Sequence, residues 1–155
     1  MITVKRLQLA DALLMIQAAE RRAAELGVAQ TICVCDDGGH PIALHRMDGA
    51  RITGVEIAMA KAFTAAGHQR PTHAFNQPGG PALPGGEAFG IHAMHPGRFA
   101  IFVGGFPIRV EGQVVGGIGI SGGTGEQDTA VAEAALAAFE AALPHEPAYH
   151  DGAGS

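Results

Sequence analysis

Hydrophobic residues recur at helical spacing in three segments of the chain. The first segment covers residues 9–26 and is followed by a glycine in the position of a left-handed C-cap. The second opens at Thr53, which has capping-box spacing to Glu56, and continues to about Ala66. The third begins after Gly125 and is stopped by a proline near the end of the chain. These patterns predict three amphipathic helices.

Five short apolar runs predict β-strands. They lie at residues 31–35, 40–47, 100–103, 106–110 and 113–121. Asp-Asp-Gly-Gly joins the first two runs and Glu-Gly joins the last two, and both are turn signals that predict hairpins. Hairpins imply an antiparallel sheet, which three helices can cover. We therefore expect an α+β fold with a five-stranded antiparallel sheet and helices on both faces.

Residues 68–97 show no hydrophobic periodicity. This stretch holds five of the nine prolines and four of the eight histidines, together with scattered apolar side chains. Its length and apolar anchors predict an ordered loop that serves as a lid, a binding loop or a subunit contact. No repeat or linker divides the chain, so we expect one domain over residues 1–143 and a flexible tail over 144–155.

Composition excludes several classes of protein. Of 155 residues, 47% are hydrophobic and 16% are charged, which excludes a disordered chain. No apolar run approaches the ~20 residues that cross a bilayer, so we expect no membrane span and a cytoplasmic protein. The net charge of −5 and the absence of tryptophan argue against a nucleic-acid surface.

Two cysteines, Cys33 and Cys35, are separated by one residue in the first predicted strand. Side chains alternate along a strand, so both thiols should lie on one face without the geometry of a redox turn. We expect buried structural thiols, while a redox or metal role stays open.

Two glycine motifs near the last strand resemble nucleotide and hydrolase signatures. Residues 117–122 match GxGxxG and residues 119–123 match GxSxG. The first motif needs a second parallel strand and the second needs a mostly parallel sheet, and neither is expected here. We therefore expect no nucleotide cofactor, and we interpret the glycines as a place where another element packs closely on the strand.

Lys61 lies in the otherwise apolar second helix, on a stripe with Thr64 and His68. The stripe is either a solvated edge or a polar wall that faces a site. The backbone N–H groups of residues 122–125 precede a helix N-terminus, where a carboxylate or phosphate is stabilised. The alternative for these groups is a capped helix without a ligand.

Several stretches in this order resemble the GlcG/HbpS-like family and the C-terminal domain of the PduO adenosyltransferase. They are VCDDGGH at 34–40, RMDGA at 46–50, AKAFTA at 60–65, GGFPI at 104–108 and GGIGISGG at 116–123. The resemblance implies an antiparallel sheet between helices, in profilin-like layering. It also implies dimers that assemble further, up to octamers, and the binding of haem or corrinoids by some members.

Combining the resemblance with the residues, we predict a homo-oligomer that binds a compact anionic ligand, with haem or a related tetrapyrrole as the named candidate. The site is expected between the second helix and the last hairpin, under the long loop. Arg46 and Lys61 would hold a carboxylate or propionate. The other candidate ligand-binding residues are Thr64, Gly104, Gly105, Ser121, Gly122, Gly123 and Thr124.

The histidines of the long loop supply the candidate catalytic and metal-binding groups. The candidates for proton transfer are His68, His73, His92 and His95, and the last two are also candidate metal ligands. An alternative function is a small enzyme of the isomerase or hydrolase type that acts on a carboxylate intermediate of a catabolic pathway. In that case a loop histidine is the acid or base and Arg46 anchors the substrate. A third alternative is an accessory protein without chemistry of its own.

Overall fold

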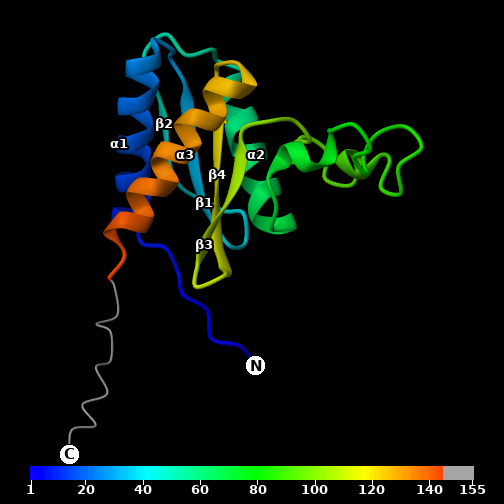
Figure 1. Ribbon diagram of the computed structural model, residues 1–155, viewed down its shortest axis with the longest axis horizontal. Coiled ribbons are helices and arrows are strands. Elements are labelled where there is room, and N and C mark those ends of the chain that lie inside the picture. The colour runs from blue at the N-terminus through cyan, green and yellow to red at the C-terminus, as the bar shows by residue number, and fades with distance from the viewer. Residues whose placement is uncertain (145–155) are drawn as a thin grey trace, which may run out of the picture.

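Three helices, two short 3₁₀ turns and four strands make up the fold in the computed structural model, which describes residues 1–144 (Figure 1). In chain order they are α1 (Leu9–Leu26), β1 (Thr31–Asp36), β2 (Pro41–Arg46), α2 (Gly54–His68), η1 (Thr72–Phe75), η2 (Ile91–Ala93), β3 (Gly105–Val110), β4 (Gln113–Ser121) and α3 (Gly125–Ala142). The α+β prediction is confirmed. The predicted tail begins at Pro144, and its residues 145–155 lie outside the described part of the chain.

The sheet has the strand order β2-β1-β4-β3, and every neighbouring pair is antiparallel. Helices α1 and α3 pack together over one face, whereas α2 covers the other (Figure 1). Ile32 and Val34 of β1 enter the core beneath α1 and α3. Cys33 and Cys35 alternate with them and pack against α2, as free buried thiols. The prediction that both cysteines share one face is therefore confirmed.

The sheet has four strands, so the predicted fifth strand at residues 100–103 is wrong. This segment bends at residues 102–104, and side chains satisfy backbone groups in it in place of a neighbouring strand. The Ala100 N–H donates to Thr64 Oγ1 over 2.9 Å, and Thr72 Oγ1 donates to the Phe102 carbonyl over 2.6 Å. Gly104 then turns the chain with a φ of +124° into β3. Hydroxyl groups from two other elements thus replace the ladder that local sequence predicts.

The caps predicted from the sequence are present at α1 and α3 but not at α2. Gly27 is the left-handed cap of α1, and Thr124 forms a capping box with Gln127 at the start of α3. At α2 the predicted capping box is absent, because the Thr53 side chain accepts no cap hydrogen bond. This helix also continues two residues beyond the expected end and stops where Gln69 adopts a φ of 57°.

Glycines in β4 allow the backbone of α2 to lie directly on the sheet. A Cβ atom at Gly119 would overlap the carbonyl oxygen of Ala58, and one at Gly117 would overlap that of Ala62. This confirms the interpretation of the glycine run as a place of close packing. Because β4 is antiparallel to both neighbours, it lacks the parallel-strand context of a dinucleotide fingerprint. Within residues 1–144, no helix has the length and apolar character needed to cross a membrane.

Candidate functional site

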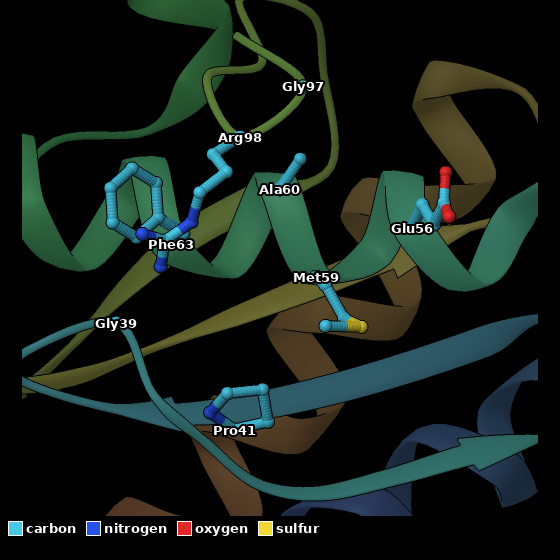
Figure 2. Close-up of a pocket in the computed structure, with 8 residues that line it drawn as sticks. All are labelled: Gly39, Pro41, Glu56, Met59, Ala60, Phe63, Gly97 and Arg98. Atoms are coloured by element: carbon cyan, nitrogen blue, oxygen red, sulfur yellow. The ribbon is translucent and has the colours of Figure 1, made fainter. Parts of the chain in front are cut away.

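A pocket of about 380 Å³ lies along the side of α2 that faces away from β4, and we call it the α2 pocket. Figure 2 shows its walls, which come from α2, the start of β2 with its preceding turn, and the end of the long loop. The lining residues are Gly39, Pro41, Glu56, Met59, Ala60, Phe63, Gly97 and Arg98. Its volume falls in the lower part of the roughly 300–1,000 Å³ range of small-molecule sites.

The helical repeat of α2 produces this wall. Glu56, Met59, Ala60 and Phe63 follow the spacing that places side chains on one face of a helix. The small residues of the opposite face pack on the sheet, so the larger side chains are left at the pocket. Gly39 has a φ of +81° in the β1–β2 turn, and any side chain at this position would overlap the Phe63 ring.

Phe63 is the centre of a cluster of charged and aromatic side chains at one end of the pocket. The Arg98 guanidinium lies over the Phe63 ring, 3.9 Å from its centroid (Figure 2). His95 meets Phe63 edge-on at 5.5 Å between centroids and stacks on Phe99 at 6.4 Å. The pocket therefore combines an aromatic surface, a fixed cation and a nearby imidazole.

His68 joins the same cluster from the last turn of α2. Its ring meets Phe75 at 5.1 Å and Phe99 at 5.4 Å, both edge-on. Burial lowers the pKa of His68 below its usual 6.5, and the nearby Arg70 and His95 lower it further. Lys61 and Thr64 of the predicted stripe are thus buried against α3 and the long loop, whereas His68 contacts the loop but is exposed to solvent.

His73 and His92 lie apart from the α2 pocket. His73 lines a separate open cleft of about 500 Å³ together with Glu126 and Glu133 of α3, and within the described residues its buried Nδ1 has no hydrogen-bond partner. His92 is exposed in η2. Across residues 1–144, no group of three or more His, Cys, Asp or Glu side chains could hold a metal ion. A metal role for His92 and His95 as a pair stays a prediction.

A second polar cluster is buried where β4 ends. Lys61 Nζ lies 3.2 Å from Asp128 Oδ2 and donates to the Ile120 carbonyl over 2.6 Å, beneath the Phe102 ring. Asp128 Oδ1 accepts from Gln30 Nε2 over 2.7 Å and from the Gly123 N–H over 3.1 Å. Burial lowers the pKa of Lys61 and raises that of Asp128, while the attraction between the two groups opposes both shifts.

The predicted ligand-binding residues fall in different places. Gly104 and Gly105 pack against Lys61, and Thr64 ties the long loop to α2. The Gly123 N–H donates a hydrogen bond to Asp128, and Thr124 caps α3. Ser121 and Gly122 lie beside the start of α2. Arg46 is exposed at the end of β2.

The space that sequence reasoning assigned to the ligand, between α2 and the last hairpin, is filled. At Gly105 and at the β4 glycines, α2 approaches so closely that no side chain would fit. The α2 pocket lies on another side of the helix and was not predicted. The helical spacing of Glu56, Met59 and Phe63 could have indicated a second face, but its partner Arg98 comes from the non-periodic loop.

Asp128 is the buried partner of Lys61 that the sequence does not predict. In the sequence it looks like an acidic residue in the first turn of a helix, which stabilises the positive end of the helix dipole. The sequence feature that could have indicated a buried anion is Lys61, because a cation in an apolar helix must reach water or meet an anion.

The family model described as "Haem degrading protein HbpS-like" matches residues 7–137. Among curated proteins, a 15.0 kDa protein from the dhaT-dhaS intergenic region of Citrobacter freundii is 38% identical over 136 residues, which cover 88% of this chain and 94% of that protein. Protein GlcG of Escherichia coli K12 is 37% identical over 114 residues, which cover 74% and 78%.

Two solved structures have the same fold at similar identity. Protein ORFY of Klebsiella pneumoniae has a TM-score of 0.86 at 35% identity, covering 93% of this chain and 97% of ORFY. The structure titled "PduOC:Heme Complex" has a TM-score of 0.81 at 32% identity, covering 86% of this chain and 95% of that one.

Proposed function

The chain belongs to the family described as "Haem degrading protein HbpS-like", and on this premise we propose that it binds haem or a related tetrapyrrole at the α2 pocket. The observation that carries the proposal is the arrangement of Phe63, Arg98 and His95 at one end of that pocket. The complex of haem with the similar PduOC supports the ligand class.

The side chains at the pocket match the chemistry that a haem group requires. A porphyrin needs an apolar surface against its ring, and Met59, Ala60 and Phe63 supply one. Iron in proteins is ligated by imidazole or thioether groups, which His95 and Met59 carry. At about 380 Å³ the pocket suits one edge of the macrocycle rather than its whole area. When bound, the haem iron would supply redox and ligand-binding chemistry.

The charges at the pocket suit the propionates of a tetrapyrrole. Arg98 presents a planar guanidinium that pairs with a carboxylate through two parallel hydrogen bonds. Stacking on Phe63 orients the guanidinium before a ligand arrives, which lowers the entropy lost on binding. Glu56 at the other end of the pocket disfavours a propionate there, so the ligand should bind with its acidic edge toward Arg98.

We also propose that the chain assembles into a closed homo-oligomer. Large apolar side chains are exposed on the long loop and before α2, where Ile52 is 77%, Phe89 64% and Met94 74% exposed. Side chains of this size and exposure are typical of subunit contacts. Light scattering should give a multiple of 15.8 kDa, and a monomer at all concentrations would contradict the proposal.

Hemin titration tests the proposed function. We expect a saturable, shifted Soret band for the full chain at about one hemin per chain, and a large loss of affinity in His95→Ala. His92→Ala is the matched control, because His92 is exposed in the same loop and has no aromatic partner among the described residues. Arg98→Gln should weaken binding about tenfold, since it removes one charge-assisted contact.

Equal small losses from alanine at His68, His73, His92 and His95 would contradict the proposal, because they would mean nonspecific adsorption to a histidine-rich surface. The cleft around His73 gives little support to the alternative of an enzyme for a carboxylate substrate. Glu126 and Glu133 line that cleft and would repel a carboxylate.

A further inference from the structure

The N-terminus of α2 lacks the side-chain cap that most helices have. Thr53 adopts helical backbone angles, with φ −68° and ψ −17°, and its side chain accepts no hydrogen bond. The Gly54 N–H donates to the Arg51 carbonyl over 3.0 Å. The 15-residue helix therefore presents the positive end of its dipole, without a capping oxygen from Thr53, at the edge of the sheet.

Two hydroxyl groups face this helix end from the sheet. Thr31 Oγ1 and Ser121 Oγ each lie 3.5 Å from the position that a Cβ atom would take at Gly54. Thr31 and Ser121 are opposite one another in the pairing of β1 with β4, so both belong to the face that α2 covers. They approach the same residue, the first of the helix.

The Thr31 hydroxyl has no partner to account for its position. Thr31 is fully buried, and no hydrogen bond within residues 1–144 uses its Oγ1. Buried polar side-chain atoms nearly always have a hydrogen-bond partner, so an unpaired hydroxyl beside the first residue of α2 calls for an explanation. A group bound at the helix end would supply the missing acceptor.

Positive charge surrounds the same place. Arg46 lies opposite Thr31 in the β1–β2 pairing and is exposed at the end of its strand. Arg51 is exposed just before the helix and donates from Nη2 to the Gly122 carbonyl over 3.3 Å. Glu56 of the first helical turn lines the α2 pocket. The combination of two guanidinium groups, a helix dipole and the unpaired Thr31 hydroxyl suits an oxyanion.

We propose that the start of α2 binds the phosphate or carboxylate group of a small ligand through the first-turn N–H groups that follow Gly54, with Ser121 and Thr31 beneath the anion and Arg46 and Arg51 beside it. We call this the oxyanion site. It is separate from the α2 pocket and does not depend on haem binding. First-turn N–H groups and hydroxyls donate to the anion, and the two arginines supply the compensating charge.

Thermal unfolding of the full chain in inorganic phosphate tests the oxyanion site. At constant ionic strength, phosphate should raise the Tm in a saturable way, whereas chloride should not. Titration with acetate then distinguishes a carboxylate site from a phosphate site, according to which anion binds at lower concentration. Arg51→Gln should weaken phosphate binding about tenfold, and Arg21→Gln, which removes an exposed charge on α1, should leave it unchanged.

Thr31→Val separates a binding role from a structural one. It removes the unpaired hydroxyl at nearly constant volume, so the Tm without phosphate should rise while the increment caused by phosphate is lost. If this variant does not fold, Gly54→Ala replaces it, because the new Cβ would make ordinary contacts with both hydroxyls and cover them.

Three results would overturn the proposal. They are the absence of a saturable increment in the wild type, an unchanged increment in Thr31→Val or Gly54→Ala, and equal weakening by Arg51→Gln and Arg21→Gln. Hemin titration of Thr31→Val should match that of the wild type. A parallel loss of hemin binding would mean that a single site serves both ligands, and would also overturn the proposal.

Discussion

Lys61 of α2 and Asp128 of α3 form a buried ion pair that joins helices on opposite faces of the sheet. The side chains are 3% and 4% exposed, and Nζ lies 3.2 Å from Oδ2. Further hydrogen bonds run from Lys61 to the Ile120 carbonyl and from Gln30 Nε2 to Asp128, whereas the buried Gln30 Oε1 has no partner among the described residues. A buried pair of this kind is costly to break from one side, because the remaining charge stays in a poorly solvated place.

We expect Lys61→Met to lower the free energy of unfolding by about 3–5 kcal/mol, measured by urea denaturation. The double variant Lys61→Met with Asp128→Asn should recover part of this loss, because no unpaired charge is then buried. Lys5→Met is the control, since it breaks an exposed pair with Glu111 and should cost less than about 1 kcal/mol. Equal losses in the two single variants would contradict the assigned role of the ion pair.

His68 should make stability depend on pH. Burial, together with Arg70 and His95, holds the pKa of His68 below 6.5 in the folded chain, so the unfolded chain takes up this proton at a higher pH. The free energy of unfolding should therefore fall as the pH drops below 6.5, until the folded chain is protonated as well. Urea midpoints between about pH 5 and pH 8 measure the slope.

The matched variant for this effect is His68→Phe. It keeps a ring against Phe75 and Phe99 but removes the titrating group, so the pH dependence should become shallower. If His68→Phe keeps the full slope, another group is responsible for it.

The two cysteines should be unreactive in the folded protein. Burial raises the pKa of both Cys33 and Cys35 to about 12, so almost no thiolate is present near pH 8. We expect a disulfide reagent to modify neither thiol in the native chain and both in guanidinium chloride. Rapid modification of native protein would contradict the buried structural role and would favour the redox or metal alternative.

A pair of glycine-to-alanine changes tests the contact between α2 and the sheet. Gly119→Ala would place a methyl group onto the Ala58 carbonyl oxygen, so we expect no cooperative thermal transition by circular dichroism. Gly67→Ala lies in α2 with no atom within 4 Å of the new methyl and should stabilise the protein by roughly 0.5–1 kcal/mol. A folded Gly119→Ala with an unchanged Tm would disprove the close approach.

Local patterns predicted most elements because the local signals and the packing agree. The Asp-Asp-Gly-Gly turn, the periodicity of residues 9–26 and the Thr124 cap each act over a few residues, and each corresponds to a feature of the fold. Residues 100–103 have equal strand character in the sequence. Thr64 and Thr72, which lie far from them in the chain, take the backbone groups that a ladder would use.

The candidate sites depend on such distant contacts even more. Arg98 meets Phe63 from a segment without periodicity, and Thr31 meets Gly54 across two layers of the fold. Neither pair of residues lies at a spacing along the chain that a helix or strand pattern would reveal. Lys61 was recognised as unusual because its local surroundings are apolar, whereas its partner Asp128 resembled an ordinary helix-start acid.

The segment between α2 and β3 is tied to the body of the protein by hydroxyls and ring contacts rather than by a strand ladder. We expect such a segment to behave as a separate cooperative unit in hydrogen exchange, with amides that open at lower free energy than those of the sheet. Arg98 and Gly97 form one wall of the α2 pocket and belong to this unit. We therefore expect this wall of the pocket to open more readily than the pairing of β1 with β4.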